Sequence, residues 1–108
     1  MSSGEKSLLI VGLTSCEPCK ELQEQIKKEE VVKELAEKHG VDASKVKIMY
    51  ADVEGPEGDE ARNICYSLDK FSSPQLIIEE KEGEKRRLCS LDDKLEKERC
   101  ADYRTLPM

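Results

Sequence analysis

The sequence is poor in aromatic residues and has no long apolar run. Only 4% of its 108 residues are aromatic, tryptophan is absent and phenylalanine occurs once, so the core must be aliphatic. The apolar run Leu8–Leu13 is far shorter than the roughly 20 residues of a membrane-spanning helix, and no secretory signal is visible. These absences predict a cytoplasmic protein that does not bind membranes.

An excess of positive charge is also missing. The chain has 18 Lys and Arg residues against 24 Asp and Glu residues, which gives a net charge of −6. An acidic surface repels phosphate backbones, and this argues against a nucleic-acid partner. The length predicts one domain over residues 1–108, with residues 1–6 frayed and residues 104–108 as a tail, and we expect a monomer.

The five cysteines do not form two close pairs. Cys16 and Cys19 are three positions apart, whereas Cys65, Cys89 and Cys100 are scattered. The usual structural zinc site needs a second close pair, so no metal site is expected. Cys65 is predicted to be a small core residue. Cys89 and Cys100 are expected to be structural or without a role, and no spacing rule supports a disulfide between them.

Two segments near the start have strand patterns. Ser7–Leu13 is apolar without alternation, which is typical of a strand buried on both faces of a parallel sheet. Lys45–Asp52 alternates and predicts a second strand. A helical segment, Glu17–Lys38, lies between them and ends before Gly40, so the two strands should be parallel. Its apolar stripe is interrupted at residues 29–30, which predicts a kink or two helices.

The second half of the chain predicts a helix, a hairpin and a final helix. The expected elements are a loop over 54–58, a helix with Asp59 as N-cap, strands over 75–79 and 85–91 joined at Gly83, and a last helix that opens at Asp92 and includes Leu95. The order β-α-β-α-β-β-α predicts an α/β protein with a four-stranded mixed sheet and helices on both faces.

The pair Cys16 and Cys19 lies where a buried strand ends and a helix begins. A spacing of three places both side chains on one side of the first helical turn, which allows a disulfide. Unpaired N–H groups and the helix dipole at this end favour a thiolate, the reactive form of cysteine. Pro18 is tolerated in a first helical turn. We predict thiol–disulfide exchange in which Cys16 attacks and Cys19 resolves the mixed disulfide.

Two segments carry a resemblance to a known family. Leu8–Lys20, with Cys16-Glu17-Pro18-Cys19 at the strand-to-helix turn, resembles the thioredoxin-fold family, in particular its small dithiol redox proteins of mixed thioredoxin and glutaredoxin character. Residues 71–78, Phe-Ser-Ser-Pro-Gln-Leu-Ile-Ile, resemble that family's cis-proline loop and the strand that follows it. The resemblance runs in the same order over nearly the whole chain and implies a thioredoxin-like fold.

The resemblance also implies site residues and partners. Pro74 should be cis and lie beside Cys16, and Ser73 should offer backbone hydrogen bonds to a bound peptide. Ser15 replaces the usual tryptophan, the first strand lacks the usual buried acid, and no Gly-Gly pair is present for glutathione. These differences favour protein disulfides over glutathione as substrates. The resemblance implies an upstream electron donor of the thioredoxin-reductase type and no cofactor.

Glu17 is the unusual residue of the motif. Its carboxylate beside Cys16 should raise the pKa of that thiol and favour a reductase over a strong oxidase. A plainer interpretation is that Glu17 only suits the first turn of a helix. Two alternatives to an oxidoreductase stay open: a metal or iron–sulfur carrier that takes further ligands from another chain, and a non-catalytic binding module.

Overall fold

The computed structural model describes residues 5–71, 73–92, 94 and 96–105. The elements, in chain order, are β1 (Glu5–Gly12), α1 (Glu17–Ile26), α2 (Glu29–His39), the 3-10 helix η1 (Ala43–Lys45), β2 (Val46–Tyr50), α3 (Pro56–Leu68), β3 (Gln75–Glu82), β4 (Lys85–Leu91) and β5 (Lys97–Asp102). No helix in these residues is long and apolar enough to cross a membrane.

The strands form one mixed sheet in the order β2-β1-β3-β4-β5. β1 pairs in parallel with β2, as predicted from the helical segment between them, and antiparallel with β3. β3 and β4 form the predicted hairpin, where Gly83 has a φ of +63° that glycine adopts without steric cost. Because β1 has a neighbour on each side and a helix layer over each face, Leu8, Leu9 and Ile10 are all buried.

The predicted fold class is wrong, because the sheet has five strands rather than four. A final helix was expected over residues 92–103, but residues 97–102 form β5, which pairs antiparallel with β4. The helical pattern of this segment depended on Leu95, which lies outside the described residues. Pairing with β4, which brings Cys100 opposite Cys89, prevails over a weak local helical preference.

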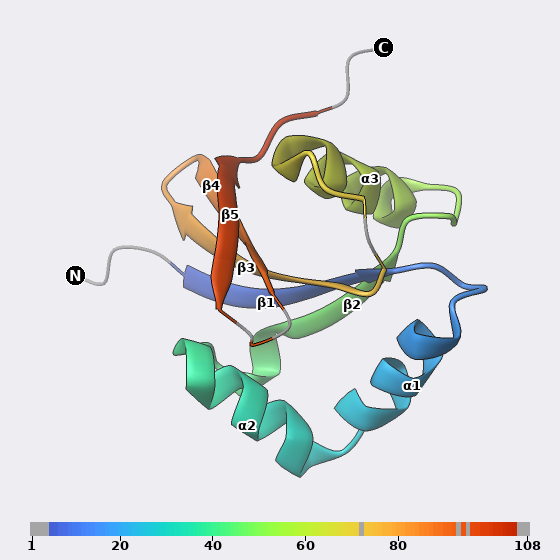
Figure 1. Cartoon of the computed structure of the whole chain (residues 1–108). Helices are drawn as coiled ribbons and strands as arrows, with labels where there is room; N and C mark the ends of the chain where they lie inside the picture. Colours follow the sequence, from blue (N-terminus) through green and yellow to red (C-terminus); the bar gives the residue numbers. More distant parts are fainter. Residues whose placement is uncertain (1–4, 72, 93, 95, 106–108) are drawn as a thin grey trace.

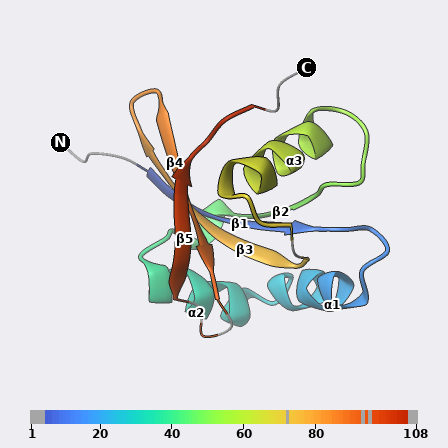
Figure 2. The ribbon, with the colours of Figure 1, turned by 45° about the horizontal axis from the view of Figure 1, so that its top comes forward.

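Helices cover the two faces of the sheet, with α3 on one face and α1 and α2 on the other (Figures 1 and 2). The core under α3 includes the whole apolar face predicted for that helix: Ala61, Ile64, Cys65 and Leu68. The core on the opposite face is smaller and contains Leu8, Ala36, Val41, Ile78 and Leu91. α1 buries only Cys19 among its described side chains, so this helix covers its part of the sheet incompletely.

The observed boundaries of the helices and of β1 confirm some predictions and correct others. The helical segment after β1 is divided into α1 and α2, as predicted, and α2 ends at Gly40 with a left-handed φ of +68°. α3 begins at Pro56 with Gly55 as N-cap, so the prediction of Asp59 as N-cap is wrong; proline is favoured at a first helical position. Residues 5–6 were predicted to fray, but they begin β1 and pair with β3.

Candidate active site

Cys16 and Cys19, called the dithiol below, lie at the N-terminus of α1. Cys16 is the N-cap, and its sulfur accepts a hydrogen bond from the backbone N–H of Cys19 at 3.3 Å. The backbone N–H of Cys16 donates to the carbonyl of Leu13 at 3.1 Å, which closes the turn between β1 and α1. Both cysteines are free thiols; Cys16 is half-buried and Cys19 is buried. The helix end therefore presents one accessible sulfur and one inaccessible sulfur.

The pKa of the Cys16 thiol is lowered, which favours the nucleophilic thiolate. The largest cause is a hydrogen bond with the Cys19 side chain; the Cys19 N–H and Ser73 also lower the pKa, and burial opposes them. Glu17 raises the pKa, but its effect is the smallest. The Glu17 carboxylate also lies 3.6 Å from Lys20 Nζ in an exposed ion pair. The direction expected for Glu17 is therefore confirmed, but the hydrogen bonds to the Cys16 sulfur outweigh it and the net pKa is lowered.

The pKa of the Cys19 thiol is raised, first because the group is buried and second because its hydrogen bond with Cys16 favours the protonated form. Gly12, the last residue of β1, permits this burial. A Cβ on Gly12 would lie 2.8 Å from Cys19 Sγ and 3.0 Å from its Cβ, closer than such atoms normally approach. Sequence reasoning missed this role of Gly12, although a glycine inside an aliphatic strand can indicate a close approach.

Ser73 and Pro74 reach the dithiol from a distant part of the sequence. The Ser73–Pro74 peptide bond is cis, which confirms that expectation. Hydrogen bonding with Ser73 lowers the pKa of both thiols, so this serine lies beside the dithiol. Pro74 and Pro18 of α1 line the same groove. The proposed backbone contact between Ser73 and a bound peptide stays a prediction.

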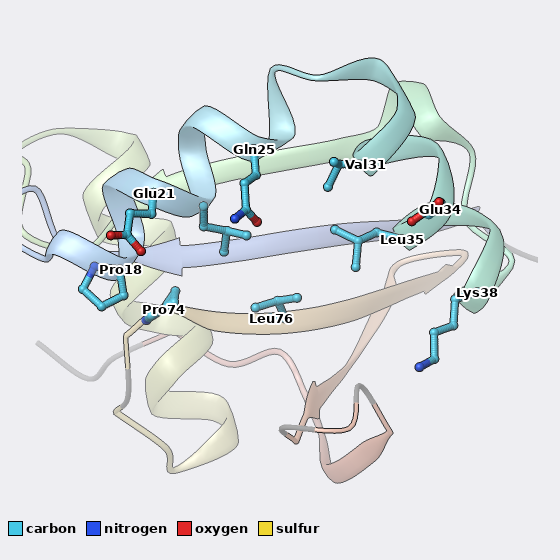
Figure 3. A pocket seen from close by; sticks show the side chains of 10 residues that line it. Pro18, Glu21, Gln25, Val31, Glu34, Leu35, Lys38, Pro74 and Leu76 are labelled. Atoms are coloured by element: carbon cyan, nitrogen blue, oxygen red, sulfur yellow. The ribbon is translucent and has the colours of Figure 1, made fainter.

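This groove lies on the sheet face that α1 and α2 cover (Figure 3). It has a volume of about 510 Å³ and follows β3 from Pro74. Its apolar lining consists of Pro18, Leu22, Val31, Leu35, Pro74 and Leu76. Composition and periodicity did not indicate a groove, because it forms where α1 leaves part of the sheet uncovered.

Contacts from the end of β2 fix the loop that carries Cys16. The Asp52 carboxylate accepts hydrogen bonds from the Thr14 N–H at 3.0 and 3.2 Å and from the Thr14 hydroxyl. These hydrogen bonds lower the pKa of Asp52, which is therefore ionised at neutral pH. The Tyr50 hydroxyl donates to the Gln23 side chain of α1. Together the two contacts hold the loop and the helix in one position relative to the sheet.

The other three cysteines lie away from the dithiol. Cys65 is buried in the core under α3, as predicted, and burial raises the pKa of its thiol. Cys89 and Cys100 are opposite each other on β4 and β5 and form a disulfide, with Cα atoms 4.0 Å apart. No spacing rule predicted this bond, because it depends on the register of two strands.

The described residues contain no group of three or more His, Cys, Asp or Glu side chains that could hold a metal ion. No known family matches the sequence, and neither a curated protein nor a solved structure is significantly similar to the chain. The chemistry of the dithiol must therefore be inferred from the residues around it.

Proposed function

We propose that this protein is a thiol–disulfide oxidoreductase that reduces protein disulfides through Cys16 and Cys19. The asymmetry of the dithiol carries the proposal. The half-buried Cys16 has a lowered pKa, and the buried Cys19 has a raised pKa. A lowered pKa supplies the attacking thiolate, and a raised pKa keeps Cys19 protonated while Cys16 reacts.

In the proposed reaction, the Cys16 thiolate bonds to one sulfur of a client disulfide and the client S–S bond breaks. The first client thiolate leaves and takes a proton from water. Cys19 then loses its proton to water and its sulfur attacks Cys16 Sγ, which breaks the mixed disulfide and releases the second client thiolate. This thiolate also takes a proton from water. The client gains two electrons and two protons, and Cys16 and Cys19 become a disulfide. A dithiol donor, of the thioredoxin-reductase type in our proposal, returns the two electrons.

Exposed apolar side chains near the site support a protein client over glutathione. Leu13, three positions before Cys16, is 36% exposed, and Phe71, two positions before Ser73, is 75% exposed. Such side chains are typical of surfaces that contact other proteins. The Cys-x-Pro-Cys motif and the cis peptide bond before Pro74 support membership of the thioredoxin-fold family as part of the same proposal.

The proposed location is the cytoplasm, where a reducing environment keeps the dithiol ready. The Cys89–Cys100 disulfide is unusual for such a location, because structural disulfides are rare in the cytosol of mesophiles. Intracellular proteins of hyperthermophiles are the exception. The charged fraction of 39% is in keeping with that exception, because surface ion-pair networks accompany thermostability.

Insulin-disulfide reduction tests the proposal. We expect Cys16→Ser to abolish activity because the nucleophile is lost. Cys19→Ser should accumulate a mixed disulfide on Cys16, detected by mass spectrometry, because nothing resolves it. Cys65→Ala, which removes a thiol elsewhere, is the control and should retain activity. A folded wild-type protein without activity, or a Cys16→Ser variant with full activity, would refute the proposed function.

A further inference from the structure

The groove begins where a client disulfide would react. Pro18 lies between the two cysteines in the sequence, and Pro74 follows Ser73, whose hydrogen bonding reaches both thiols. Both prolines line one end of the groove, and Leu76 and Leu35 continue its lining away from them (Figure 3). A chain whose disulfide reacts at the dithiol would therefore reach the groove at its Pro18 and Pro74 end.

The charges around the groove indicate the chemistry of its occupant. Glu21 of α1 and Glu34 of α2 line it, and both are exposed. Within the described part of the chain, neither carboxylate forms a hydrogen bond or an ion pair. The one cation of the lining, Lys38, donates a hydrogen bond to the Lys94 carbonyl at 3.2 Å. An occupant would thus meet an apolar surface with two unpaired carboxylates and one ammonium group, so the charged side chains of the lining are net negative.

We propose that the groove binds the extended segment of a client protein next to its reducible disulfide, and that it prefers a segment with an aliphatic side chain and a Lys or Arg. This inference rests on the proposed function and adds a substrate preference to it. The aliphatic side chain would pack on Leu22, Leu35 and Leu76. The cation would lie near Glu21, at the end lined by the two prolines, or near Glu34, at the opposite end (Figure 3). Alternate residues of an extended segment point in opposite directions, so one segment can present both groups.

The volume and the position of the groove favour a peptide segment over a separate small ligand. About 510 Å³ is within the range of ligand sites, roughly 300–1,000 Å³, but small-ligand sites enclose most of their ligand. This groove is lined by α1, α2 and the start of β3, and at one end it is lined by Pro18 and Pro74, which adjoin Cys19 and Ser73 in the sequence. Binding there would hold the client disulfide at Cys16 and replace a bimolecular encounter by an oriented one.

The first experiment measures binding without chemistry, on the Cys16→Ser/Cys19→Ser variant. Two labelled peptides without cysteine carry the same Leu and Val residues and differ only in having two Lys or two Glu residues. By fluorescence anisotropy at low salt, we expect the Lys peptide to bind about fivefold more tightly, with the difference shrinking as salt is added. Equal affinities, or no binding of either peptide, would overturn the proposed preference.

The second experiment assigns the effect to the groove. Glu21→Lys/Glu34→Lys should remove the preference for the Lys peptide. The matched control, Glu24→Lys/Glu37→Lys, changes one exposed glutamate on each helix outside the groove and has the same net charge as Glu21→Lys/Glu34→Lys. An equal loss in both double variants would show only a general charge effect and would overturn the assignment.

The two proposals fail in different ways. In the wild-type protein, insulin reduction together with equal binding of both peptides would refute the groove and retain the oxidoreductase. Preferred binding of the Lys peptide by a protein that cannot reduce insulin would refute the oxidoreductase and retain the groove as a peptide-binding site.

Discussion

The two cysteine pairs of this protein differ in what surrounds their sulfurs. Cys16 and Cys19 are free, one helical turn apart, with pKa shifts in opposite directions. Cys89 and Cys100 are bonded across two antiparallel strands, and no thiol remains there to titrate. The first environment gives the two thiols different acidities, as the proposed exchange reaction requires. The second joins β5 covalently to the sheet.

The two cysteine pairs differ in how the neighbouring backbone N–H groups are used. At the N-terminus of α1, the backbone N–H of Cys19 donates a hydrogen bond to the Cys16 sulfur, which stabilises the thiolate form of Cys16. In the β4–β5 pair, the backbone N–H groups belong to the ladder and the two side chains face each other. The same residue type is therefore a free thiol with a lowered pKa in one region and a covalent link between two strands in the other.

The largest effect that separates the two pairs is expected from Cys100→Ser. Removing a disulfide between residues 11 positions apart should lower the free energy of unfolding by about 3 kcal/mol, because the unfolded chain gains freedom. Urea unfolding without reductant measures this change. The rate at which Cys16 is alkylated should not change. A variant as stable as the wild type would show that the bond does not hold β5.

Gly12→Ala should disturb the dithiol through its buried member. The new Cβ would lie 2.8 Å from Cys19 Sγ, so we expect a loss of about 2 kcal/mol of stability from overpacking. A double-mutant cycle with Cys19→Ala, followed by urea unfolding, isolates this contact. The alanine at position 12 should cost less when the Cys19 sulfur is absent. If Gly12→Ala lowered the stability equally in the wild type and in Cys19→Ala, the strain would come from a contact other than the one with the Cys19 sulfur.

The pH dependence of alkylation should separate the two sulfurs. Since the pKa of Cys16 is lowered, its reaction with iodoacetamide should reach half its maximal rate at a lower pH than the reaction of an ordinary cysteine does. Since the pKa of Cys19 is raised, Cys19 should react only at higher pH. Peptide mapping of the alkylated protein by mass spectrometry gives both profiles. Coincident profiles would remove the asymmetry on which the proposed function depends.

The pKa shifts of Cys16 and Cys19 have opposite effects on how the free energy of unfolding changes with pH. The folded state binds fewer protons at Cys16 than the unfolded chain does between the two pKa values, so stability rises with pH there and is lost as pH falls through the folded pKa. At Cys19 the folded state binds more protons, so stability falls as pH rises above the pKa of the unfolded chain. Comparing urea unfolding of Cys16→Ser and Cys19→Ser across pH separates the two contributions.

The smallest effect is expected from Glu17→Gln. Glu17 raises the pKa of Cys16 only slightly, so its removal should lower that pKa slightly and shift the alkylation profile of Cys16 to lower pH. Glu24→Gln, which lies further along α1, is the control and should leave the profile unchanged. A shift to higher pH after Glu17→Gln would contradict the direction of the effect.

Local patterns could predict the dithiol and much of its support. Three of these features depend on residues close in sequence. They are the spacing of Cys16 and Cys19, the continuous apolar run of the strand before them, and the glycine that follows α2. The cis bond before Pro74 was expected from a resemblance, and its place beside the thiols depends on the sheet.

Features that depend on register could not be predicted. β5 has few apolar residues, and its pairing with β4 becomes evident only when Cys100 is placed opposite Cys89. The contact between Gly12 and Cys19 and the groove beside Pro74 likewise need the angle at which α1 crosses the sheet. The direction of the Glu17 effect on the pKa of Cys16 could be predicted, but its small size relative to the hydrogen bonds that oppose it could not, because those hydrogen bonds depend on the fold.

The Cys89–Cys100 bond also changes what a protease can do to this chain. It closes a covalent ring over residues 89–100, and Lys94 lies exposed inside that ring. When trypsin cuts after Lys94, residues 95–108 stay attached through the disulfide, and the two fragments migrate as one molecule until a reductant separates them. The C-terminal segment therefore stays covalently attached after a single backbone break between Cys89 and Cys100.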